Sequence, residues 1–182
     1  MIDLRANGNF LSPFLRLLLS LALLSAAPAW AQTESLKSIA ILDFELVDDQ
    51  AATVPDTTVG PRLNAISAQL REEFAKEGLY RVVDNAPAAE LMAKLKVSQE
   101  FRTCNGCELD VGKALGADRV LIGWVQKVSN LILNLNVQIE DTKTGTVILN
   151  KSVDLRGNTD TSFRRGISYM VRSMIDKHQG NR

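Results

Sequence analysis

The chain has a single histidine and only two cysteines, Cys104 and Cys107. A zinc site needs about four ligands, and the histidine, His178, stands far from the cysteines in the sequence, so we expect no metal site. Covalent haem attachment needs a histidine directly after a C-x-x-C pair, and residue 108 is a glutamate. These scarcities exclude the usual metal and haem roles of cysteine.

Two roles remain for Cys104 and Cys107. In an oxidising compartment a C-x-x-C pair closes into a disulfide, which here would staple a turn. The alternative is a thioredoxin-like redox pair, in which the first cysteine stands at a helix N-terminus just after a strand. Residues 98–103 are polar and do not resemble a core strand, so we favour the structural disulfide and keep the thiol–disulfide redox protein as the alternative.

The chain also has no excess of positive or negative charge, because 21 Lys and Arg balance 21 Asp and Glu. Such a chain has neither the basic footprint of a nucleic-acid binder nor the polybasic cluster that anionic membranes attract. It also lacks a Gly-rich phosphate loop, a Ser-centred nucleophile elbow and a metal triad. We therefore expect no cofactor, no nucleic-acid partner and no enzymatic activity.

The N-terminal part of the chain has the pattern of a secretory signal peptide, which we place at residues 1–31. Arg5 and Arg16 precede the apolar run Leu17–Leu24, and Ala29-Trp30-Ala31 is a small-residue cleavage site. The apolar run is shorter than the ~20 residues that span a bilayer, although an uncleaved anchor is the alternative. No cysteine follows the cleavage point, so we expect a periplasmic chain that starts at Gln32, is not a lipoprotein and has no transmembrane segment.

The remaining sequence predicts a polar leader at 32–36, a single α/β domain at 37–178 and a tail at 179–182. Segments of apolar alternation or continuous β-branched residues predict strands, and apolar residues at spacings of three and four predict helices. The predicted strands are residues 38–46, 79–84, 117–128, 131–140 and 146–155. The predicted helices are residues 63–77, 85–95, 108–115 and 163–177, and residues 47–61 are a predicted loop that is either a plain surface loop or a binding loop.

This order predicts an α+β fold, in which helices pack against a mixed sheet of about five strands. The last three strands form an antiparallel meander. In the clearest of them the apolar side chains of one face alternate with Ile132 and the polar residues 134, 136, 138 and 140, which indicates one buried and one polar face. The predicted buried residues are Leu131, Leu133, Leu135, Val137 and Ile139. Lys151 stands on the apolar face of the following strand and indicates a bulge or an exposed end there.

The polar face of the meander is a candidate binding surface. Asn134, Asn136 and Gln138 present a row of amides, and Trp124 lies on the neighbouring predicted strand. Aromatic residues are enriched in recognition surfaces. The alternative is a solvated sheet face with Trp124 in the core.

A second candidate surface consists of the arginines near the last predicted helix. Arg156, Arg164 and Arg165 could bind a carboxylate or a phosphate. The alternative is an ordinary solvated helix face.

Two segments carry a resemblance to known proteins: SIAILDFEL at 38–46 and VGKALGADRVLIGWVQKVSNLILNLNVQIEDTKTGTVI at 111–148. They resemble the periplasmic α/β domains of the TolB N-terminal, CsgG and LpoB type. The C-N-G-C turn at 104–107, G-W-V-Q-K-V-S-N-L-I-L-N at 123–134 and R-G-N-T-D at 156–160 are similar to a proteobacterial family of exported domains of unknown function.

The resemblance implies an envelope fold whose relatives are scaffolds, activators and secretion parts. The lipid-anchoring cysteine of CsgG and LpoB and the propeller of TolB have no counterpart here, so pore formation and propeller-borne binding do not carry over. We therefore expect a non-catalytic periplasmic accessory or assembly domain that binds another periplasmic or envelope protein. A small-molecule carrier is a further alternative.

Overall fold

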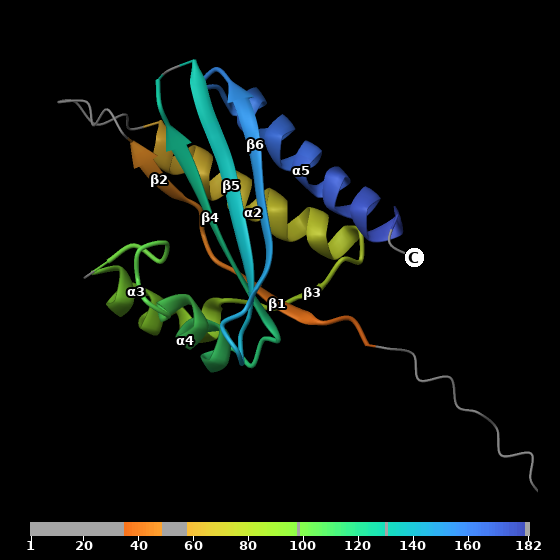
Figure 1. Cartoon of the computed structure of the whole chain (residues 1–182). Coiled ribbons are helices and arrows are strands. Elements are labelled where there is room, and N and C mark those ends of the chain that lie inside the picture. The colour runs from red at the N-terminus through yellow and green to blue at the C-terminus, as the bar shows by residue number, and fades with distance from the viewer. Residues whose placement is uncertain (1–34, 49–57, 98, 130, 181–182) are drawn as a thin grey trace, which may run out of the picture. The chain divides into compact units, whose positions relative to one another are not determined.

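The computed structural model describes residues 35–48, 58–97, 99–129 and 131–180. The predicted signal peptide, most of the polar leader and most of the predicted loop at 47–61 lie outside the described residues. Within them the fold is α+β, with helices packed on a mixed six-stranded sheet (Figure 1). The strands are β1 (Ser38–Ile41), β2 (Glu45–Asp48), β3 (Arg81–Val82), β4 (Arg119–Lys127), β5 (Ile132–Asp141) and β6 (Val147–Arg156).

The helices follow the predicted order. They are α2 (Val59–Lys76), the 3₁₀ turn η1 (Ala86–Ala88), α3 (Ala89–Lys96), α4 (Cys107–Ala114) and α5 (Asp160–Gly180). Helix α2 buries the predicted stripe of Leu63, Ile66, Leu70 and Phe74. Thr159 caps the N-terminus of α5, since its hydroxyl accepts a hydrogen bond from the Ser162 backbone N–H at 3.2 Å.

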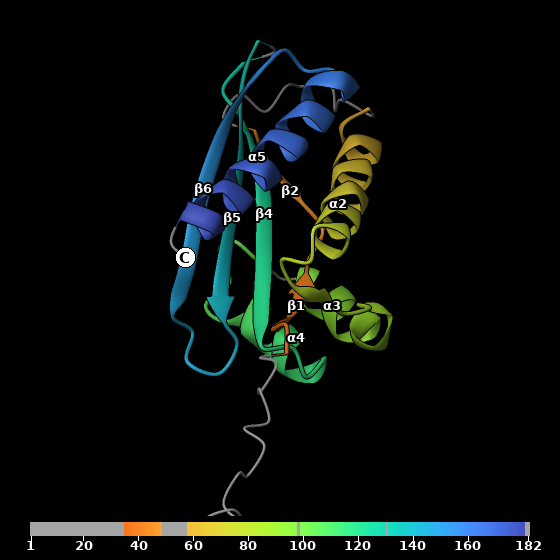
Figure 2. The same cartoon turned by 90° about the vertical axis from the view of Figure 1, so that its right-hand side faces the viewer.

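Strand β4 is central to the sheet. It pairs in parallel with β1 and β2 on one side and antiparallel with β5 on the other, while β3 and β6 are the outer partners of β1 and β5. Helices α2 and α5 lie side by side over one face of the sheet, and α3 and α4 lie near the end formed by β1 and β3 (Figures 1 and 2). The helices therefore cover the two faces unequally.

The core has two parts because successive side chains of a strand point to opposite faces. Ile39 and Ile41 of β1 join the larger cluster with the apolar stripes of α2 and α5. Ala40 and Leu42 join a smaller cluster with residues of α3, α4 and the chain between them. Both faces of β1 are thus buried.

The predicted strand 38–46 is interrupted. Ile41 stands opposite Leu121 and Glu45 opposite Trp124, so three residues on this side face two residues of β4. One extra residue in a strand is a β-bulge, which shifts all later side chains to the other face. The bulged segment contains Phe44, whose ring packs against Gly123 in the middle of β4.

The interruption also leaves backbone groups without sheet partners, and side chains supply them. The Phe44 backbone N–H donates to the Ser67 hydroxyl of α2 at 2.9 Å. The Ile41 carbonyl accepts from Arg71 at 2.8 Å and from the Asn85 amide at 2.7 Å. These side chains come from α2 and from the residue before η1, so they fix the irregular segment in place.

The meander follows the predicted alternation. Leu133, Leu135, Val137 and Ile139 are all buried against α2 and α5. Leu131, in contrast, is 74% exposed, because β5 begins one residue later.

Lys151 needs neither a bulge nor an exposed end. The register shift lies between Ile139, which is opposite Leu149, and Glu140, which is opposite Val147, so the extra residue of β6 is Ile148 and not Lys151. Lys151 is half-buried on the helix-facing side of β6, where its ammonium donates a hydrogen bond to Ser173 of α5. The hydroxyl of Ser173 thus provides the polar partner that a lysine on an apolar face requires.

We expect Gly123→Ala to lower the free energy of unfolding by about 1–3 kcal/mol, the usual cost of overpacking a core. An added Cβ would lie 2.5 Å from Cε1 of Phe44, which is itself only 4% exposed and has no room to withdraw. Urea denaturation measures the change. Gly60→Ala is the control, since nothing lies within 4 Å of its Cβ position in helix α2 and alanine favours helix there. Equal stability of the two variants would contradict the packing described.

Candidate functional site

The first candidate site is the amide face, which we define as Trp124, Asn134, Asn136 and Gln138. The sheet register brings these residues together: Trp124 stands directly opposite Asn136, and the three amides follow one another along the same side of β5. Their alternate neighbours fill the core under α2 and α5, so the amides point to the other side of the sheet. The register thus places these four residues next to one another on one side of the sheet.

Hydrogen bonds hold the amides in place. The Asn134 amide donates to the carboxylate of Asp154 on β6, Asn136 donates to the Asn134 carbonyl at 3.2 Å, and Gln138 donates to Glu140. None of the three amide oxygens accepts a hydrogen bond from a residue that the structure describes. The three amides therefore present their oxygen atoms as oriented hydrogen-bond acceptors on this side of the sheet.

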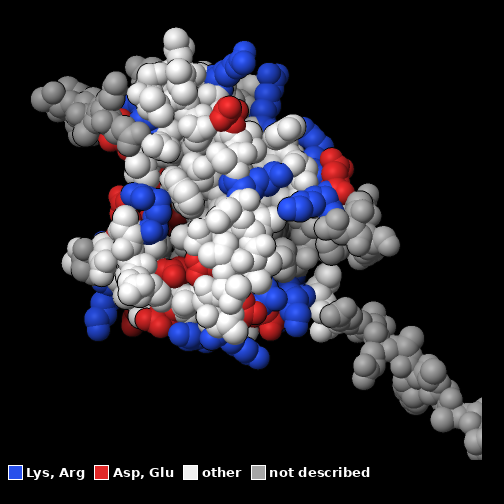
Figure 3. Space-filling model, in the orientation of Figure 1, with Lys and Arg blue, Asp and Glu red and all other residues white. Residues whose placement is uncertain are grey.

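Trp124 has a mixed environment. It packs against the smaller core cluster and is half-buried, so part of the indole is core and part faces outward. Figure 3 looks onto β4–β6 and shows mostly uncharged side chains over this face, with several charged side chains among them and more around its margins. The amide face is thus a polar but largely uncharged surface beside an aromatic ring.

The predicted arginine surface is divided between two faces. Arg156 stands opposite Ile132 on the same side of the sheet as the amides. Arg164 and Arg165 belong to α5, on the opposite face, where they line a surface hollow with Arg172 and Tyr169. The structure thus brings Arg164 and Arg165 together and leaves Arg156 apart from them.

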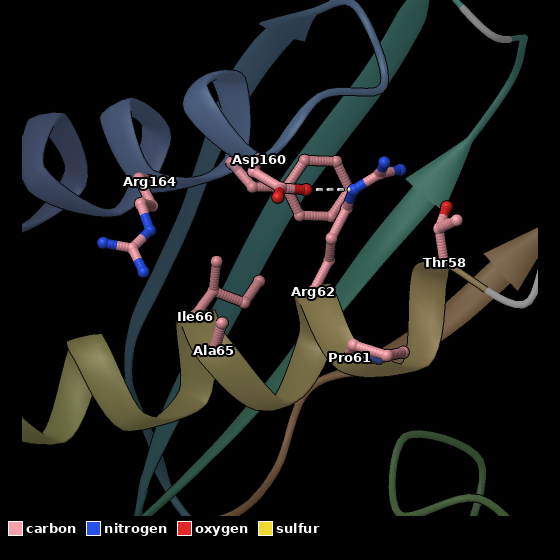
Figure 4. A pocket seen from close by; sticks show the side chains of 8 residues that line it. Thr58, Pro61, Arg62, Ala65, Ile66, Asp160 and Arg164 are labelled. Carbon is pink, nitrogen blue, oxygen red and sulfur yellow. Dashed lines mark hydrogen bonds and ion pairs between the residues drawn. The ribbon is translucent and has the colours of Figure 1, made fainter.

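A second candidate site is the α2–α5 pocket, a cavity of about 390 Å³ between the first turns of those two helices. Its lining residues are Thr58, Pro61, Arg62, Ala65, Ile66, Asp160, Phe163 and Arg164. Figure 4 shows the ion pair of Arg62 and Asp160 crossing the groove on one side of Ile66 and the Arg164 side chain reaching from α5 towards α2 on the other. The distance from Arg62 Nε to Asp160 Oδ1 is 2.5 Å.

Sequence reasoning pointed to Arg164 and missed Arg62 and Asp160. These two residues are 98 positions apart, and only Asp160 belongs to a motif, as the last residue of R-G-N-T-D at 156–160. The docking of α2 on α5 creates the pocket, so no local pattern could have revealed it.

The third candidate site is the disulfide turn. Cys104 and Cys107 are bonded, with Cα atoms 5.6 Å apart, and Cys107 begins α4. Gly106 has a φ of 99° at the N-cap, a conformation that glycine adopts without strain. The preceding Phe101 is buried, and its backbone N–H donates to the Glu45 carboxylate at 2.9 Å. The turn is therefore anchored on both sides, as expected of a structural staple.

A buried carboxyl group next to the disulfide was not predicted. Glu108 follows Cys107, is 6% exposed, and its Oε2 atom has no hydrogen-bond partner among the described residues. Burial raises the pKa of Glu108, and the nearby charges of Glu140 and Asp110 raise it further, while backbone N–H groups at the start of α4 oppose the shift. The carboxyl group of Glu108 is a candidate for proton exchange, although it belongs to the first turn of α4 and does not line the α2–α5 pocket.

Within the described residues no group of three or more His, Cys, Asp and Glu side chains could hold a metal ion. The helices in that part of the chain include none that is both long and apolar enough to cross a membrane.

Comparison with known families gives one match. Residues 37–175 match the model of the DUF3280 family, whose description is "Protein of unknown function (DUF2380)". The match spans most of the chain, so the chain belongs to this family. No curated protein matches it.

Solved structures show similarity at low sequence identity. The LpoB C-terminal domain from Salmonella enterica is 16% identical with a TM-score of 0.49, covering 69% of this chain and 87% of that chain. Lipoprotein GNA1162 from Neisseria meningitidis is 17% identical with a TM-score of 0.46, covering 80% and 97%. TolB from Acinetobacter baumannii is 12% identical with a TM-score of 0.40, covering 76% and 28%. LpoB and TolB are two of the types that the sequence motifs resemble.

We expect Glu108→Gln to stabilise the chain increasingly as the pH rises. Because the folded-state pKa is raised, the unfolded chain gives up this proton first, and ionisation favours unfolding. The stability that the protonated carboxyl contributes is complete below its unfolded pKa and is lost as the pH rises through the folded pKa. Thermal melts of both proteins from acid to neutral pH measure the difference.

The control for this experiment is Glu72→Gln, the same substitution at an exposed glutamate of α2. A Glu108→Gln effect that stays constant across the pH range would contradict the burial of an ionisable Glu108.

Proposed function

We propose that this member of the DUF3280 family is a non-catalytic accessory or assembly domain of the periplasm that binds another envelope protein through the amide face. The exported, unlipidated state is part of this proposal and rests on the A-x-A site before Gln32 and on the absence of cysteine at that position. The observation that carries the proposal is the unequal covering of the sheet. Helices α2 and α5 bury one face of β5 and β6, and the amide face is on the other (Figure 1).

The chemistry of the amide face suits a protein partner. The centres of protein interfaces are depleted of charged residues and enriched in aromatic ones. Asn134, Asn136 and Gln138 already donate hydrogen bonds within the chain, so their orientation is set before a partner arrives. Pre-set side chains lose less conformational entropy on binding.

The arrangement of the ionisable groups supports a non-catalytic role. General acid–base catalysis needs a pKa-shifted group inside a substrate-sized cavity. The carboxyl group with a raised pKa is that of Glu108, in the first turn of α4, whereas the α2–α5 pocket lies between two other helices. The carboxyl group with the raised pKa and the cavity therefore lie in different parts of the described structure.

The test of the proposal uses a photo-crosslinking amino acid placed at position 136 and, as a control, at the exposed Glu72 of α2 on the other face. We expect a discrete crosslink to one envelope protein from position 136 and none from position 72.

The crosslinked partner is then purified and titrated against Asn136→Arg and Glu72→Arg. A bulky charge on the amide face should weaken binding about tenfold or more, by the usual effect of a residue central to an interface. Equal affinities of the two variants would contradict the proposed surface.

A second candidate function is thiol–disulfide exchange by Cys104 and Cys107. The observation that favours it is the position of the disulfide at the start of α4, directly before the buried Glu108. A helix N-terminus lowers a thiol pKa, and a nearby carboxyl could accept a proton.

The double variant Cys104→Ser, Cys107→Ser separates the two functions. As a staple of a four-residue loop, the disulfide contributes about 2 kcal/mol. We expect the variant to fold, to melt a few degrees lower and to keep its partner, and the native disulfide to have a potential below about −300 mV. A potential near −200 mV together with thiol-exchange activity would identify the redox function instead.

A further inference from the structure

We propose that the α2–α5 pocket binds a small organic anion that carries a short apolar chain. The pocket lies on the face of the sheet opposite the amide face, so this inference goes beyond the proposed function and does not depend on it. Its volume of about 390 Å³ is within the range of small-molecule sites.

The charges that line the pocket leave one cation in excess. Arg62 and Asp160 form an ion pair, and Arg62 also donates from Nη1 to the Asn158 side chain at 2.9 Å. These contacts fix the guanidinium in place. Arg164, on the other side of the pocket floor, forms no ion pair with any residue that the structure describes, and its guanidinium is the cation in excess (Figure 4).

Neighbouring groups do not cancel this charge. Glu73, further along the α2–α5 interface, forms no ion pair with Arg164, and its Oε1 atom accepts hydrogen bonds from Gln69 and Ser168, both at 2.7 Å. The first turn of α2, which opens onto the pocket, contains no acidic residue. The positive end of the helix dipole therefore adds to the arginines.

The floor of the pocket is apolar. Ile66 of α2 and Phe163 of α5 are each 1% exposed and belong to the larger core cluster, and Pro61 and Ala65 form the wall above them. An inorganic anion would leave this apolar surface unused. A ligand with one anionic group and a short hydrocarbon chain would satisfy Arg164 and cover the floor at once, and guanidinium groups bind carboxylates and phosphates alike.

The experiment is a calorimetric titration of the whole mature chain with octanoate and with octyl phosphate. Octanol and inorganic phosphate are the control ligands, each lacking one of the two features. We expect binding of at least one of the two amphipathic anions in the millimolar range or tighter and clearly weaker binding of both controls. Comparison of octanoate with octyl phosphate shows whether the natural anion is a carboxylate or a phosphate.

Arg164→Gln should weaken binding of the preferred anion about tenfold, the effect of losing one hydrogen bond to a charged group. The matched control is Arg172→Gln, because Arg172 lies on the same helix and lines neighbouring hollows but not this pocket. Amide NMR spectra of both variants establish that they are folded. The proposal is overturned if neither anion binds, if octanol binds as well as octanoate, or if Arg164→Gln and Arg172→Gln have the same effect.

Discussion

The contact between Gly123 and Phe44 is the constraint on which the rest of the sheet depends. Strand β4 joins the parallel strands β1 and β2 to the antiparallel meander, and Gly123 stands at its centre. The missing side chain leaves a gap in the surface that faces α2, between Leu121 and Val125, and the Phe44 ring occupies it. Phe44 lies in the bulged segment between Ile41 and Glu45, so its contact with Gly123 is made where the first strand divides into β1 and β2.

The bulge has consequences for both faces. Before it, Ile39 and Ile41 face α2 and α5; after it, Leu46 takes over that side and Glu45 turns to the other. Glu45 can then accept hydrogen bonds from the backbone N–H groups of Phe101 and Arg102, which hold the chain between α3 and α4 against the sheet. The disulfide turn thus owes its position to a change of register some 60 residues earlier in the chain.

Polar contacts between distant segments secure the ends of the sheet. The Asp118 carboxylate accepts hydrogen bonds from the backbone N–H of Ser38 at 2.9 Å and from its hydroxyl at 2.8 Å, and Asp118 returns a backbone hydrogen bond to the same hydroxyl. These contacts lower the pKa of Asp118. A lowered pKa stabilises the fold above the unfolded pKa, and that stability is lost as the pH falls through the folded pKa. Asp118 and Glu108 therefore act in opposite directions with pH.

The sequence by itself determined the α+β class, the order of helices and strands, the buried alternation of β5 and the common face of Asn134, Asn136 and Gln138. These properties follow from periods of two and of three to four residues, which are local. Only the tertiary structure decided the break at Phe44, the burial of Glu108 and the pocket that joins Arg62 to Asp160 and Arg164. Each of these depends on residues that are distant in the sequence and meet only when helices dock on the sheet, so no local periodicity records them.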